Sequence, residues 1–349
     1  MRRFLILVKE GRKIMNSSET NDFLAISRGE AAVLMGGAWQ ENSWFRHLSK
    51  LVKKGFYEGD NESQLQLHRI LNSIYRVLTV VPDPGAETLE GTPYIESIRS
   101  TIEKGFIDWL NDTCVLNGIV VPGETSFANW LWQFVETHPA ATHQAYFEFL
   151  ANRATIEDLR FYLVQESAID ASTDDFLASL QIGAPGEAKM EIARNYWDEM
   201  GEGDPNFLHS TLFSDALGAF SISNMEAENA LTLEALICGN LQQMVGLRRN
   251  LFHIGVGYFG ATEQLVPKRF EALKRGWERV GLNPSAAKYH MLHIEVDGGH
   301  SEGWYQNVVA PLSKRSEQVR REITTGALYR LVTSHIYLDK LLRDFPSQN

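Results

Sequence analysis

The segment from Tyr289 to His300 contains three histidines, an aspartate and a glutamate within twelve residues. His293, Asp297 and His300 follow one another at spacings of four and three residues, so on an α-helix their side chains would share one face. Apolar residues fill most of the other positions, which predicts a helix packed in the interior. Imidazoles and a carboxylate on one buried face are typical of a metal site, because an isolated polar group is costly to bury. The simpler alternative is a buried helix whose polar groups are only hydrogen-bonded.

Composition and charge restrict the class of protein. The chain has 349 residues, 44% of them hydrophobic and 22% charged, and a formal net charge of −11. This balance is ordinary for a globular protein with a large core, and the negative charge argues against a nucleic-acid partner. Two cysteines, Cys114 and Cys238, are too few for a disulfide framework. Lys9 and Glu10 interrupt the short apolar run near the N-terminus and no apolar stretch reaches about 18 residues, so we expect a cytoplasmic protein without a membrane segment.

Apolar residues recur at helical spacing along most of the chain. The first section shows this pattern over 29–55, 62–80 and 94–110, with a Pro- and Gly-rich loop between the last two. Beyond this section, helices follow one another without a strand pattern. The sequence therefore predicts an all-α protein with an N-terminal helical extension over residues 1–120 and a core domain over 121–349.

The segment GVGYFG, residues 255–260, matches the G-x-G-x-x-G pattern of dinucleotide-binding loops. The match is weak, because no strand precedes it and the surroundings predict the middle of a long helix. Glycines in such a helix instead allow a neighbouring helix to approach closely, or leave room for a ligand.

If the segment 289–300 binds metal, other helices should supply further donors. Glu166, Glu199 and Glu263 lie in or beside apolar segments, and His209 follows Glu199 by ten residues across a turn rich in Gly and Pro. Each of these carboxylates alone would more often face solvent. The complete set of candidate metal ligands is Glu166, Glu199, His209, Glu263, His293, Asp297 and His300. Four carboxylates and three imidazoles without a thiolate favour two iron or manganese ions over structural zinc or an iron–sulfur cluster.

These residues resemble the metal ligands of the heme-oxygenase-like di-iron oxidases, often labelled iron-containing redox enzymes. That family places a glutamate on one helix, a glutamate and a histidine around a turn, a glutamate on a long helix, and an aspartate and a histidine on a late helix. The resemblance covers roughly residues 127–320, and its order and separations match closely. It assigns these roles, in that order, to Glu166, to Glu199 and His209, to Glu263, and to Asp297 and His300.

His293 matches an additional histidine found in members of the family that oxidise nitrogen. These include the central domain of the nitrosourea-forming enzyme of streptozotocin biosynthesis and the lysine oxygenases that form 6-nitronorleucine. His290, one turn earlier, is the alternative for this role. The paired Glu-x-x-His motifs of ferritin-like four-helix bundles are not found. The resemblance implies a heme-oxygenase-like helical bundle of about seven core helices.

The resemblance further implies a non-heme di-iron oxygenase that uses O2 as co-substrate and an external electron donor. In such an enzyme O2 would add to the iron pair as a peroxo-di-iron(III) species. This species would attack the amine of an amino acid or a similar small metabolite, with hydroxylamine, nitroso or nitro products. Oxidative carbon–carbon cleavage, decarboxylation or desaturation on the same scaffold is one alternative. A metal-free helical binding protein or a thiaminase-like protein is an alternative of another class.

The N-terminal extension carries none of the candidate ligands. Its apolar helical faces need to be covered by the core domain or by a second copy of the chain, and closed two-fold pairing is the commonest solution. We therefore expect a homodimer. Three further histidines, His138, His143 and His335, are interpreted as structural, and no motif identifies the substrate-binding residues.

Overall fold

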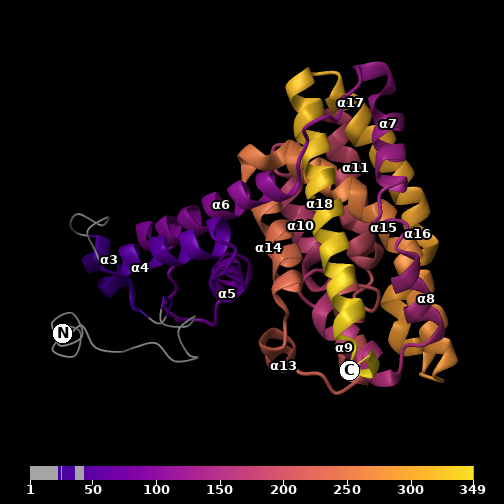
Figure 1. Cartoon of the computed structure of the whole chain (residues 1–349), viewed down its shortest axis with the longest axis horizontal. Coiled ribbons are helices and arrows are strands. Elements are labelled where there is room, and N and C mark those ends of the chain that lie inside the picture. The colour runs from indigo at the N-terminus through magenta and orange to yellow at the C-terminus, as the bar shows by residue number, and fades with distance from the viewer. Residues whose placement is uncertain (1–22, 25, 36–42, 349) are drawn as a thin grey trace. The chain divides into compact units, whose positions relative to one another are not determined.

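The computed structural model describes residues 23–24, 26–35 and 43–348, with the side chains of residues 33 and 295–298 outside the description. The described residues form helices and turns without a strand, which confirms the predicted all-α class (Figure 1). None of these helices is long and apolar enough to span a membrane. The chain divides into two compact units, Met1–Phe106 and Ile107–Asn349. The sequence-based boundary at residue 120 lies within the second unit and stays a prediction.

The N-terminal unit is helical over the described parts of the segments that the apolar spacing predicts; residues 36–42 of the segment 29–55 lie outside the description. Its helices are α3 (Arg28–Met35), α4 (Ser43–Val52) with the π-helical turn η2 (Lys53–Tyr57), α5 (Asn61–Thr79) and the first part of α6 (Pro93–Thr113), which crosses the boundary between the units. The Asp60 carboxylate accepts a hydrogen bond from the backbone N–H of Ser63 and so caps α5. The rings of Phe56, His68 and Phe106 pack against one another in the core of this unit.

The C-terminal unit contains the remaining helices (Figure 1). In chain order they are α7 (Glu124–Glu136), α8 (Gln144–Asn152), α9 (Ile156–Glu166), α10 (Thr173–Gln181), α11 (Gly186–Glu199), α12 (His209–Ala219), α13 (Asn224–Asn229), α14 (Leu233–Leu247), α15 (Phe252–Arg279), α16 (Lys288–Trp304), α17 (Ala310–Ser313) and α18 (Glu317–Asp344). Helix α15 is central to the packing, because it lies against α8, α16 and α18. Its buried residues extend from Gly255 to Trp277, so this helix runs through the core for most of its length.

Two glycines bring the backbones of α15 and α18 into contact. A Cβ at Gly257 would lie 1.8 Å from the carbonyl oxygen of Ile323, and a Cβ at Gly326 would lie 1.9 Å from that of Ile254. A side chain at either position would force the two helices apart. The glycine pattern at residues 255–260 lies inside α15 and serves helix packing, which is one of the two roles expected for it.

Helix α16 is fixed to α15 at its C-terminal end. Trp304, its last residue, donates a hydrogen bond from Nε1 to the carbonyl oxygen of Val256 at 3.0 Å. The π-helical turn η7 (Tyr305–Val309) follows, and the Tyr305 hydroxyl donates to Gln264 Oε1 at 3.0 Å. These bonds hold the register of α16 along α15, which sets the height of every side chain on the histidine-bearing face.

Replacing Gly257 by alanine should destabilise the C-terminal unit, because the new Cβ would collide with the Ile323 carbonyl oxygen. Overpacking of this kind costs about 1–3 kcal/mol or more, and it should outweigh the roughly 1 kcal/mol by which alanine favours a helix over glycine. Chemical denaturation would show the loss as a lower midpoint at an unchanged slope. Gly218→Ala in α12 is the matched control: a Cβ there would meet no described atom within 4 Å, so its midpoint should hold or rise. A wild-type midpoint for Gly257→Ala would contradict the close backbone contact.

Candidate metal centre

Glu199 and His209 flank one sharp turn. Glu199 ends α11 and His209 begins α12, and the turn between them contains Gly201 and Gly203 at φ angles of 62° and 89°. Nδ1 of His209 lies 2.9 Å from Glu199 Oε2, and Nε2 of His293 on α16 lies 3.6 Å from Glu199 Oε1. One donor atom of each of these three residues lies within 4.8 Å of the other two, and all three residues are buried.

A backbone contact fixes the orientation of the His293 ring. Its Nδ1 lies 2.9 Å from the carbonyl oxygen of Tyr289, one helical turn earlier. A carbonyl oxygen can only accept, so Nδ1 carries the proton and donates it. The opposite nitrogen, Nε2, is thereby held toward Glu199, where it can carry a proton or bind an ion. Histidines that bind metals are commonly oriented by a hydrogen bond of this kind from the other ring nitrogen.

Glu199 remains a carboxylate in the interior. Burial alone raises the pKa of its side chain, but hydrogen bonds and charges from His209 and His293 outweigh burial and lower this pKa to about 2. Glu199 is therefore negatively charged at neutral pH. A cation placed among the three side chains would balance that charge in the same way.

A second group of side chains lies beside the first. His300 of α16 has Nε2 2.8 Å from Asp198 Oδ2, and its Nδ1 lies 3.5 Å from Oε2 of Glu263 on α15. Asp198 directly precedes Glu199, so two neighbouring carboxylates of α11 contact two histidines of α16. Asp198 is not among the residues predicted from the sequence, where adjacency to Glu199 is its only signal.

Asp297 lies in α16 between His293 and His300, the two histidines that contact α11. Its side chain lies outside the described residues, so its role as a metal ligand stays a prediction. The helix predicted for the segment 289–300 lies within α16.

Glu166 lies in a separate buried group. It is the last residue of α9 and is fully buried. Arg269 of α15 has Nη2 3.1 Å from Glu166 Oε2, and the Tyr337 hydroxyl donates to Oε1 at 2.7 Å. The structure thus surrounds Glu166 with a guanidinium and a phenol, and not with the histidines of the candidate set. Arg269 balances the charge of this carboxylate, because an unpaired buried charge would be strongly destabilising.

Asp170, which is not among the residues predicted from the sequence, lies within electrostatic reach of both His293 and Arg269. Its Oδ1 is 4.0 Å from Arg269 Nη2, and its buried Oδ2 has no hydrogen-bond partner among the described residues. Burial and the charge of Glu166 raise the pKa of Asp170, while Arg269 and His293 act in the opposite direction. A buried oxygen without a partner needs an explanation such as an unseen water or ion. The spacing of four residues from Glu166 is its only signal in the sequence.

His290 belongs to neither group. Its ring is fully buried, with the Phe270 ring centroid at 4.8 Å and the Tyr289 ring centroid at 5.1 Å. Neither ring nitrogen has a hydrogen-bond partner among the described residues. Burial lowers the pKa of His290 well below its usual value, so the ring is neutral. Of the two histidines considered for the additional ligand, the structure brings His293 to Glu199.

The donors around Glu199 fit a ferrous ion. Two imidazoles and one carboxylate, from His209, His293 and Glu199, are the combination that many non-heme iron oxygenases use. Glu263 and His300 offer a further carboxylate and imidazole beside them. All these donors are nitrogen or oxygen atoms, which suits iron or manganese better than a thiolate-bound metal.

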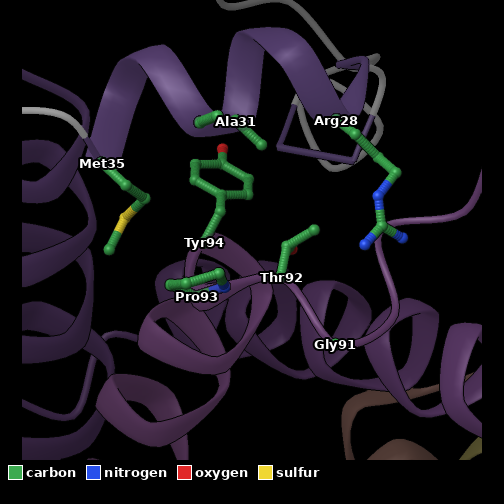
Figure 2. Close-up of a pocket in the computed structure, with 8 residues that line it drawn as sticks. Arg28, Ala31, Met35, Gly91, Thr92, Pro93 and Tyr94 are labelled. Atoms are coloured by element: carbon green, nitrogen blue, oxygen red, sulfur yellow. The ribbon is translucent and has the colours of Figure 1, made fainter.

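The N-terminal unit contains a cavity of a different kind (Figure 2). It has a volume of about 390 Å³ and lies between α3 and the start of α6, with the Tyr94 ring directed toward Ala31. The described residues that line it are Arg28, Ala31, Ala32, Met35, Gly91, Thr92, Pro93 and Tyr94. No carboxylate or imidazole side chain is among them, so this lining offers no counterpart to the metal donors of the C-terminal unit.

The C-terminal unit contains the segment that matches a known protein family. A family model described as iron-containing redox enzyme matches residues 160–334, just over half of the chain, and this region contains every candidate metal ligand. No curated protein matches the sequence significantly. Among solved structures, a domain of unknown function with a heme oxygenase-like fold from Shewanella denitrificans is similar at 13% identity and a TM-score of 0.48. That match covers 64% of this chain and 93% of the other.

Replacing His293 by alanine should lower iron uptake, because it removes one of the three donors grouped around Glu199. The fold should survive, since the position lies in a helix that alanine favours. Metal analysis after anaerobic loading with Fe(II) measures the effect. His290→Leu is the matched control, one turn away on the same helix and among aromatic rings, and it should retain wild-type iron uptake. The reverse pattern, with iron lost in His290→Leu and kept in His293→Ala, would show that the register of α16 is wrong.

Proposed function

Because the chain belongs to the iron-containing redox enzymes, we propose that it is a non-heme di-iron oxygenase that uses O2 to oxidise the amine nitrogen of an amino acid or a similar small metabolite. The observation that carries the proposal is the buried contact of Glu199 with His209 and His293. Polar groups of this kind are costly to bury. A cation bound by these three side chains would offset that cost, and its open coordination positions would give the group a catalytic role.

The grouping of the side chains supports two ion positions. One iron would be held by Glu199, His209 and His293, and the other by Glu263 and His300 with Asp297 as a further ligand. When bound, iron in such sites supplies electrons and open coordination positions for reaction with O2. An external electron donor would restore the reduced state for each turnover.

The surrounding residues orient the donors and exclude water. The Tyr289 carbonyl oxygen holds the Nδ1 proton of His293, and Asp198 lies against Nε2 of His300, so that Nδ1 of that ring faces Glu263. Burial keeps bulk water from these groups, and the low pKa of Glu199 keeps that carboxylate ionised. The chain therefore presents charged, oriented donors before any ion enters.

The seventh ligand has two candidates. Glu166 joins the set only if its carboxylate turns away from Arg269 and Tyr337. Asp170 offers the same chemistry without breaking a hydrogen bond at Oδ2, because that atom has no hydrogen-bond partner among the described residues. The resemblance assigns this role to Glu166, and we propose Asp170 as the carboxylate that can replace it.

His293 supports nitrogen as the site of oxidation. The resemblance links an additional histidine at this position to family members that oxidise amines, and His293 contacts Glu199. Attack at carbon on the same scaffold, by cleavage, decarboxylation or desaturation, remains the alternative within this class.

The reduced, iron-loaded protein should oxidise one member of a panel of amino acids and small amines when mixed with O2. Mass spectrometry with 18O2 should find labelled oxygen on nitrogen, in a hydroxylamine, nitroso or nitro product. His293→Ala should lose most of this product, and His290→Leu should keep it.

Two outcomes would contradict the proposal at different levels. Release of CO2 or an alkene without an N-oxygenated product would move the reaction to carbon. A folded protein that takes up well below one iron per chain would reject the di-iron centre and leave a metal-free binding or thiaminase-like protein.

We also propose that the chain forms a homodimer through its N-terminal unit. Exposed apolar side chains in this unit include Tyr57, Val80 and Val81, with Val81 89% exposed. Light scattering at micromolar concentration should give about twice the chain mass of 39.5 kDa. A single chain mass would refute the pairing.

A further inference from the structure

A second group of metal-type donors lies elsewhere in the C-terminal unit. His143 caps the start of α8, and His335 and Asp339 lie one turn apart on α18. His143 Nε2 is 3.0 Å from Asp339 Oδ1, and His335 Nε2 is 3.9 Å from Asp339 Oδ2. One donor atom from each residue lies within 4.8 Å of the other two.

These separations suit a divalent transition-metal ion. Bonds of about 2.0–2.2 Å in tetrahedral geometry place neighbouring donor atoms roughly 3.4 Å apart. The two nitrogen–oxygen distances fall on either side of that value, so small side-chain movements would enclose an ion. His335 lies four residues before Asp339 on α18, so the two side chains share the helix face that meets His143, and the His143 and His335 ring centroids are 5.3 Å apart.

The group can be reached from solvent, unlike the buried centre around Glu199. The side chains of His335 and Asp339 are 38% and 43% exposed, so an ion can enter and keep water as its remaining ligand. Nδ1 of His335 is buried and has no hydrogen-bond partner among the described residues. No described neighbour therefore fixes the tautomer of this ring; an ion on Nε2 would place the ring proton on the buried Nδ1, where no described acceptor meets it.

Binding has to displace one proton from His143. Its Nδ1 accepts a hydrogen bond from the Tyr146 backbone N–H at 3.3 Å, so its Nε2 carries the proton that it donates to Asp339. An ion at Nε2 would take the place of that proton, which would move to Nδ1 of the same ring, so that Nδ1 would no longer accept from the Tyr146 N–H. The Tyr146 N–H would keep a partner, because it also lies 3.1 Å from the His143 carbonyl oxygen.

We propose that His143, His335 and Asp339 form a separate metal site, for a divalent ion such as Zn²⁺, that joins the start of α8 to α18. The ligands come from opposite ends of the C-terminal unit's sequence, so the complete site exists only in the folded chain. An ion that binds only the folded chain stabilises it. This site shares no residue with the group around Glu199 and does not depend on the proposed oxygenase function.

Equilibrium dialysis of the full-length chain against Zn²⁺, followed by metal analysis, tests the site. Wild type should bind one zinc more per chain than either His335→Ala or Asp339→Asn. Both replaced side chains are partly exposed, so the two variants should fold and should match the wild-type thermal midpoint in metal-free buffer. Added zinc should raise the midpoint of the wild type more than that of either variant.

His253→Ala is the matched control. His253 Nδ1 lies 2.8 Å from Glu322 Oε2, a histidine–carboxylate pair that belongs to no group of three donors among the described residues. This variant should bind as much zinc as wild type. The centre around Glu199 is unchanged in all four proteins, so its own zinc cancels in the comparison. Equal zinc counts in wild type, His335→Ala and Asp339→Asn would overturn the site, as would an equal loss in His253→Ala.

Discussion

The structure of the C-terminal unit depends on stabilising one negative charge that is buried in its interior. Removing the Glu199 carboxylate from solvent costs several kcal/mol, on the order of the total stability of a domain. His209 and His293 share in offsetting this cost, each in proportion to how closely its ring faces the carboxylate. A slip of α16 by one residue would rotate His293 by about 100° around the helix axis. The hydrogen bonds from Trp304 to Val256 and from Tyr305 to Gln264 oppose that slip. Contacts at the C-terminal end of α16 therefore keep His293, in the middle of the helix, facing Glu199.

The sequence predicts the part of this arrangement that arises from local spacing. His293 and His300 share a helix face, and Glu199 and His209 flank one turn. The proximity of the two residues in each pair can therefore be predicted from a short stretch of sequence. Glu166 shows the limit of this reasoning. Its contacts are Arg269 and Tyr337, which are 103 and 171 residues away along the chain. Such distant partners leave no periodic pattern, and a buried glutamate beside an arginine looks the same in a sequence as one beside a metal.

Carboxylates without a motif are equally hard to predict. Asp198 and Asp170 each lie close to a predicted ligand, yet single aspartates near the ends of helices are common on protein surfaces. His143 and His335 are interpreted as structural from the sequence, and nothing there points to Asp339, because the contact between His143 and Asp339 joins residues 196 positions apart. The glycines at residues 255–260 illustrate the opposite case: a helix context in the sequence is enough to favour packing over nucleotide binding.

The close seam between α15 and α18 also bears on how an ion reaches the interior. With backbone against backbone at Gly257 and Gly326, neither helix can slide or tilt to open a path. The turn between Glu199 and His209 is built differently. It is largely exposed, and it contains residues in the left-handed region at positions 201–203. Two of the donors flank this turn. We therefore expect a metal ion to enter the buried site by movement of this turn.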